Sequence, residues 1–127
     1  MTMTPEHTFT EENIRRMVYD FYDGVRRDEL LGPVFDAALS HGWDEHLPRM
    51  VDFWSTVLLG TRKFQSNVFG KHMALQGIEK EHFIRWLALF RATAARVYAP
   101  EQADEVVTVA ERIATSLQLG YFGEKRA

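Results

Sequence analysis

The 127-residue sequence contains no cysteine, no run of apolar residues long enough to cross a membrane and no excess of basic charge. The absence of cysteine excludes disulfides, thiolate metal ligation, iron–sulfur clusters and a cysteine nucleophile. No apolar run approaches the roughly 18 residues of a membrane span. The first ten residues are polar and lack the apolar core of a signal peptide. These absences predict a soluble cytoplasmic protein that makes no use of a membrane.

Charge and organisation point to one ordinary globular domain. The 15 basic and 18 acidic residues are mixed along the chain, giving a net charge of −3. No basic stripe marks a phosphate-backbone footprint, so nucleic acid is not an expected partner. The chain has no internal repeat, low-complexity tract or linker. We therefore expect a single domain over residues 1–127, with residues 1–9 as a flexible N-terminal segment.

Aromatic residues are plentiful, with 9 Phe, 4 Tyr and 3 Trp. They provide more flat apolar surface than a small helical core usually needs. A planar aromatic cofactor would use this surface, although dense packing alone would also account for it.

The first half of the chain carries two long helical patterns. The first follows Thr10, a suitable N-cap, and its apolar stripe is Ile14, Met17, Val18, Phe21, Tyr22 and Val25. Gly32-Pro33 then breaks the chain, and a short helical turn is expected to begin at Val34. The second long pattern runs from about Trp43 to Leu59, and Gly60 ends it. Its expected inward face consists of His46, Met50, Phe53, Trp54, Val57 and Leu58.

The second half reads as a loop and two further helices. Residues 61–76 show little periodicity and predict a long loop with one helical turn around His72. Residues 79–98 predict a helix with an inward face of Phe83, Trp86, Leu87, Phe90, Ala94 and Val97. Residues 99–101 are expected to separate it from a last helix, which carries Val106, Val109, Ala110, Ile113, Leu117 and Tyr121. Because no strand pattern occurs anywhere, the expected fold class is all-α.

Four polar side chains occupy the inward stripes of the expected helices or the expected loop over residues 61–76: Tyr22, His46, His72 and Trp86. No serine or inward carboxylate joins them, so a nucleophile with its base is not indicated. The two histidines lack the helical spacing of a zinc pair, and carboxylate ligands are missing. One imidazole that holds an iron, facing a hydroxyl, an indole and a second imidazole, would make a haem pocket for a diatomic gas. Each residue also has an ordinary explanation, as a buried tyrosine bonded to a carbonyl or a histidine at a helix end.

Several segments, in this order and at these separations, resemble the truncated haemoglobins of the third group. They are FYDGVR (residues 21–26), LGPVF (31–35), EH (45–46) followed by DFW (52–54), KHMAL (71–75) and FIRWLALF (83–90). The resemblance covers nearly the whole chain. The first two groups of that family generally carry Gly-Gly pairs, and this chain has none, which favours the third group.

The resemblance implies a two-over-two helical sandwich around haem b, held non-covalently since the chain has no cysteine for attachment. It identifies His72 as the proximal ligand of the iron. It identifies Tyr22, His46 and Trp86 as distal residues that face the bound ligand. The other expected haem contacts are Phe35 at the haem edge, the aromatic pair Phe53 and Trp54, Met50 where the family usually has an aliphatic residue, and Arg49 near a propionate.

Three functions remain open on this evidence. The first is reversible binding of dioxygen, nitric oxide or another diatomic ligand. The second is enzymatic, either nitric oxide detoxification as a dioxygenase or peroxidase-like chemistry, with a reductase as partner. The third is a helical interaction domain without a cofactor. His7, His41 and His82 lie in loops or off the inward stripes, and we expect no role for them.

Overall fold

The computed structural model describes residues 5–39, 42–60 and 78–122, with side chains up to residue 119. This part of the chain contains the helices α1 (Glu11–Arg27), α2 (Leu31–Leu39), α3 (Trp43–Leu59), α5 (Lys80–Val97) and α6 (Pro100–Phe122). It contains no strand, only an isolated bridge between Glu6 and Tyr98. The predicted all-α class is confirmed. The expected loop over residues 61–76, including His72, lies outside the described residues.

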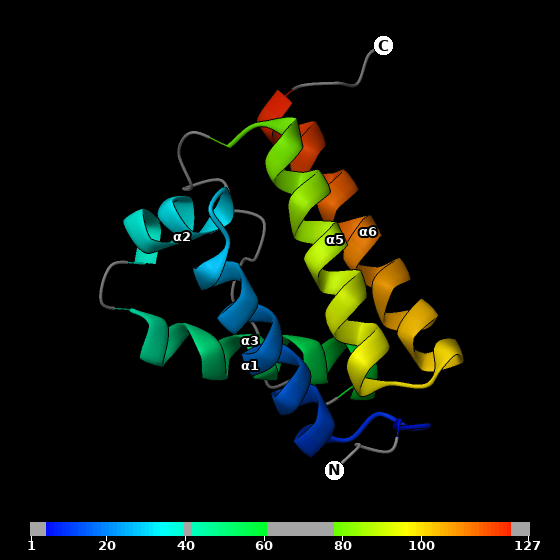
Figure 1. Ribbon diagram of the computed structural model, residues 1–127. Coiled ribbons are helices and arrows are strands. Elements are labelled where there is room, and N and C mark those ends of the chain that lie inside the picture. The colour runs from blue at the N-terminus through cyan, green and yellow to red at the C-terminus, as the bar shows by residue number, and fades with distance from the viewer. Residues whose placement is uncertain (1–4, 40–41, 61–77, 123–127) are drawn as a thin grey trace.

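Helix α1 lies in the middle of the helices (Figure 1). Helices α5 and α6 lie side by side as an antiparallel pair, and α3 passes behind α1 in this view. Helix α1 contacts α2, α3 and α5. Side chains on the inward face of α1 are therefore surrounded by three other helices.

Among the helices in the described ranges, none is both long and apolar enough to cross a bilayer.

Helix α1 begins where the sequence predicts. The Thr10 hydroxyl accepts a hydrogen bond from the backbone N–H of Asn13 at 3.1 Å, and the Asn13 side chain accepts one from the N–H of Thr10 at 3.0 Å. This reciprocal cap satisfies amides that would otherwise lack partners. The predicted apolar stripe is confirmed, because all its members are buried: Ile14, Met17, Val18, Phe21, Tyr22 and Val25. The cap fixes the helical register that turns Tyr22 inward.

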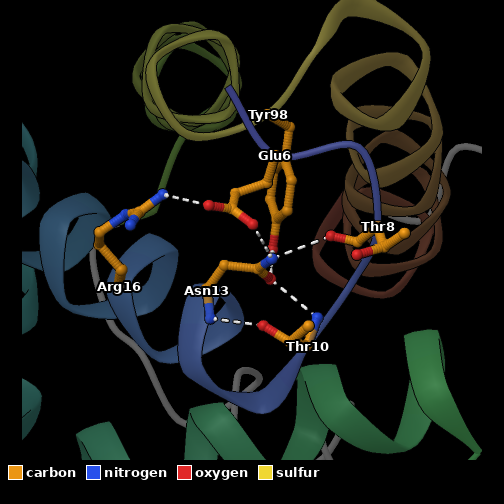
Figure 2. A network of polar contacts seen from close by, with 6 residues as sticks. All are labelled: Glu6, Thr8, Thr10, Asn13, Arg16 and Tyr98. Atoms are coloured by element: carbon orange, nitrogen blue, oxygen red, sulfur yellow. Dashed lines mark hydrogen bonds and ion pairs between the residues drawn. The ribbon is translucent and has the colours of Figure 1, made fainter. Parts of the chain in front are cut away.

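The N-terminal segment 1–9 was expected to be flexible, and hydrogen bonds attach its residues Glu6 and Thr8 to the helices (Figure 2). The backbone N–H of Ala99 donates to the carbonyl of Glu6 at 2.9 Å. The hydroxyl of Tyr98 donates to the buried Asn13 side chain at 2.8 Å, and the same amide group donates to the Glu6 carboxylate at 3.3 Å. These bonds tie the segment to the turn between α5 and α6, because buried polar groups require partners.

Two helices begin earlier than predicted, each with a proline in its first turn. The expected start at Val34 is wrong, since α2 begins at Leu31. The Asp28 carboxylate accepts the N–H of Leu31 at 2.9 Å and so caps the helix. The expected separator before the last helix is also too long, because α6 begins directly at Pro100. Proline suits a first turn, where its missing amide would have no helical partner.

The close approach of α1 and α2 depends on Gly32. A β-carbon on Gly32 would lie 2.8 Å from the backbone oxygen of Arg26. We expect Gly32→Ala to destabilise the protein by about 1–3 kcal/mol, because backbone must move to relieve the overlap. The matched control is Gly24→Ala in α1, where a β-carbon would meet nothing within 4 Å. That variant should be about 0.5–1 kcal/mol more stable than the wild type. Chemical denaturation of both variants would measure these changes, and equal stabilities would contradict the close contact.

Helix α3 has the predicted bounds, but its buried face is rotated from the predicted one. Gly60 ends the helix in a left-handed conformation with φ 71°, as expected from its sequence position. The buried residues are Trp43, Met50, Val51, Trp54 and Ser55. Val57, predicted to face inward, is 43% exposed. The predicted inward face was centred too far toward Phe53 and Val57. In the structure these two residues lie at the margin of the buried face of α3.

Candidate functional site

Side chains from four helices meet in one continuous group of rings, which we call the aromatic cluster. Helices α1, α2, α3 and α5 all contribute to it. Its members are Phe21, Tyr22, Phe35, Trp43, His46, Trp54, Trp86 and Phe90. Edge-to-face contacts dominate, and these position rings more tightly than area burial alone.

Tyr22 is the centre of one half of the cluster. Its ring lies 4.9 Å from that of His46, 5.9 Å from Trp43 and 6.1 Å from Phe35, measured between centroids. The side chain is only 3% exposed. Burial raises the pKa of the Tyr22 hydroxyl well above its usual range, because the phenolate would lose its hydration. The hydroxyl therefore stays protonated, and able to donate a hydrogen bond, across the physiological pH range.

Trp86 belongs to the other half, in a stack that runs from α5 to α3. Its ring lies 5.6 Å from Phe90 at an angle of 25°, and Phe90 lies 5.2 Å from Trp54 at 28°. Phe21 joins the two halves, with its centroid 4.8 Å from Tyr22 and 5.6 Å from Trp86. The hydroxyl of Tyr22 and the indole of Trp86 thus belong to the same group of rings, separated by one phenylalanine.

The structure places the other predicted site residues in different environments. Phe35 and Met50 are buried, at 6% and 7% exposure. Phe53 is half-buried and meets Trp54 edge-on at 5.4 Å. Arg49 is exposed on α3. His72, the predicted iron ligand, lies outside the described residues.

Phe90 and Trp43 belong to the cluster but were missing from the predicted site. Phe90 was assigned to the inward face of its helix but not to the site, although it links Trp86 to Trp54. Trp43 was taken only as the start of α3, yet it contacts both Tyr22 and His46. A signal was available, because Trp43 precedes His46 by three residues and so shares its face of the helix.

The expectation for His82 also needs correcting. This residue was expected to lie off the inward stripe and to have no role. It is 8% exposed, and its Nδ1 atom accepts a hydrogen bond from the N–H of Glu79 at 2.9 Å. The Glu79 side chain in turn accepts from the backbone at residue 82, which completes a reciprocal cap. His82 therefore helps to begin α5 and has a structural role.

The donors of the cluster suit a pocket for a small polar ligand beside a flat cofactor. A phenol, an indole N–H and an imidazole lie among apolar rings, and the phenol and imidazole rings are in direct contact. His46, Phe53 and Trp86 are half-buried, whereas the rings that they contact are buried. The described part of the chain holds no group of three or more His, Cys, Asp or Glu arranged for a metal ion. This donor set fits a haem pocket with its axial ligand supplied from elsewhere in the chain.

Comparisons with known proteins extend the similarity to the whole chain. No protein-family model matches it. A relative from Campylobacter jejuni subsp. jejuni, described as "Group 3 truncated hemoglobin ctb", is 32% identical over 114 residues, covering 87% of this chain and 90% of the relative. A crystal structure of the group III truncated hemoglobin from Campylobacter jejuni matches with a TM-score of 0.90 and 29% identity. That match covers 98% of this chain and all of the other.

Proposed function

This chain belongs to the group 3 truncated haemoglobins, and we propose that it is a haem protein that reversibly binds dioxygen or another diatomic ligand. The truncated-globin fold predicted from the sequence is confirmed by the structural match. The observation that carries the proposed function is the meeting of Tyr22, His46 and Trp86, from three different helices, in one aromatic cluster. Both similar proteins are described as hemoglobins, which supports the same conclusion.

The proposed cofactor is haem b, held without a covalent bond since the chain contains no cysteine. Haem supplies an iron atom to which a diatomic ligand binds. The proposed ligand of the iron is His72. The proposed lining consists of Phe35, Met50, Phe53, Trp54 and Trp86, with Arg49 near a propionate. Support for this lining comes from Phe35, Trp54 and Trp86, which belong to the same aromatic cluster as Tyr22 and His46.

The distal residues would hold the diatomic ligand through hydrogen bonds. The Tyr22 hydroxyl is buried and protonated, so it is available as a donor. The indole N–H of Trp86 can only donate, and His46 supplies a third donor from the adjacent ring. Hydrogen bonds gain strength in surroundings of low dielectric constant. The rings of Phe21, Phe35 and Trp54 would exclude water from this region and so strengthen the bonds to the ligand.

The second candidate is enzymatic and uses the same residues. Three donors gathered near one ligand would polarise it, which favours nitric oxide dioxygenation or peroxidase-like chemistry, with electrons from a reductase partner. The third hypothesis, an interaction domain without cofactor, is disfavoured by membership of a haemoglobin family.

An equilibrium measurement separates the first two functions. We expect the ferrous haem-loaded protein to bind dioxygen saturably, at one ligand per chain, and to release it unchanged when the gas is removed. Under the enzymatic alternative, nitric oxide or peroxide would be consumed steadily in the presence of a reductant and a reductase. Steady consumption at many turnovers per chain, with poorly reversible dioxygen binding, would contradict the primary function.

A further inference from the structure

Trp43 is held in the aromatic cluster by a hydrogen bond and a cation–π contact as well as by ring contacts. It is the first residue of α3 and is 5% exposed. Its indole Nε1–H donates a hydrogen bond to Oδ1 of Asp36, in α2, at 3.0 Å. The guanidinium carbon of Arg26, in α1, lies 4.7 Å from the ring centroid, within the range of a cation–π interaction. Three helices therefore fix the position of one indole.

The same indole forms part of the surroundings of the distal residues. Its centroid lies 5.7 Å from that of His46, and the two ring planes are inclined at 86°. The ring of His46 meets that of Tyr22 at 4.9 Å and again at 86°. The imidazole is thus held between two rings, one from its own helix and one from α1. Moving it out of this place would lose both edge-to-face contacts.

We propose that Trp43 is a positioning residue for His46 and that Asp36 controls it from the surface. The inference rests on the proposed function, in which His46 faces the ligand. Asp36 is exposed and belongs to α2, and its hydrogen bond fixes the orientation of the indole. With the indole fixed, the position of His46 between the rings of Trp43 and Tyr22 is favoured. Loss of the Asp36 bond releases the indole, and His46 then swings away from the ligand more often.

The test is a matched pair of substitutions at this surface carboxylate. Asp36→Ala removes the acceptor, whereas Asp36→Asn keeps a side-chain oxygen that can accept the indole N–H. In Asp36→Ala we expect carbon monoxide to associate with the ferrous haem-loaded protein roughly two- to tenfold faster, because His46 swings away from the ligand more often. A change of this size corresponds to the loss of one hydrogen bond. The infrared band of bound carbon monoxide should shift toward that of a His46→Leu reference. Asp36→Asn should resemble the wild type in both measurements.

A second readout does not involve haem. In the purified protein with no cofactor added, proton NMR should show cross-relaxation between the indole of Trp43 and the ring of His46. This signal should persist in Asp36→Asn and weaken at least about twofold in Asp36→Ala. A protein that binds no haem would refute the proposed function and still permit this test. Wild-type cross-relaxation, or a wild-type carbon monoxide band, in Asp36→Ala would overturn the positioning role, since a merely structural role changes melting temperature without moving either signal.

Discussion

Replacing His72 by glycine is expected to abolish the retention of haem. In the proposed site this imidazole makes the one bond from the protein to the iron, while the aromatic lining contributes only apolar contact. The variant should lose its haem on a desalting column that leaves the wild type fully loaded. Added imidazole should restore retention, because the free base can occupy the space that the side chain leaves. Absorption at the Soret maximum, relative to that at 280 nm, measures both effects.

A control separates this outcome from a general effect of removing a histidine. His7 is exposed in the N-terminal segment and far in sequence from the proposed pocket. His7→Gly should retain haem as the wild type does. If His72→Gly kept its haem without imidazole, the proximal assignment would be wrong and another side chain would have to hold the iron.

Removing the Tyr22 hydroxyl is expected to raise the dissociation rate of dioxygen by about ten- to a hundredfold. A charge-assisted hydrogen bond contributes about 1.5–3 kcal/mol, and each 1.4 kcal/mol corresponds to a tenfold change. Tyr22→Phe keeps the ring that contacts Trp43 and His46, so the fold should be preserved. Trp86→Phe should have an effect of the same size, because it removes the indole N–H. Stopped-flow mixing of the oxygenated protein with excess carbon monoxide measures the rate.

The same helix offers a matched control for this experiment. Tyr19 is 39% exposed on α1, and Tyr19→Phe removes a hydroxyl that faces the surface. Its dissociation rate should equal that of the wild type. If Tyr22→Phe and Trp86→Phe both released dioxygen at the wild-type rate, neither residue would be a donor to the ligand.

Helix bounds were predictable where a local signal marks them. Thr10 caps α1 and Gly60 ends α3, and both appear in the sequence as residues suited to those positions. The start of α2 was missed because the carboxylate of Asp28 caps it from the preceding turn, before a Gly-Pro pair that resembles a break. The attachment of the N-terminal segment was missed as well. It depends on bonds from Glu6 to Ala99, which are remote in sequence.

The candidate site shows the same division between local and long-range information. The helical periodicity of the sequence was enough to predict that Tyr22 faces inward, and the side chain is buried in the structure. The spacing of three residues placed Trp43 on the same helix face as His46. Its contacts with Arg26, Asp36 and Tyr22 could not be predicted, since these residues come from two other helices. His82 was misread because a side chain that caps a backbone amide leaves no periodic signal. The assignment of His72 came from the family resemblance and not from spacing.

The most direct test of the central claim, that this chain is a haem protein, is the absorption spectrum of the purified protein titrated with haem. The account predicts an intense Soret band that reaches its maximum at one haem per chain and shifts when the ferrous protein binds carbon monoxide. A protein that stays colourless, and in whose presence added haem keeps the spectrum of free haem, would contradict it.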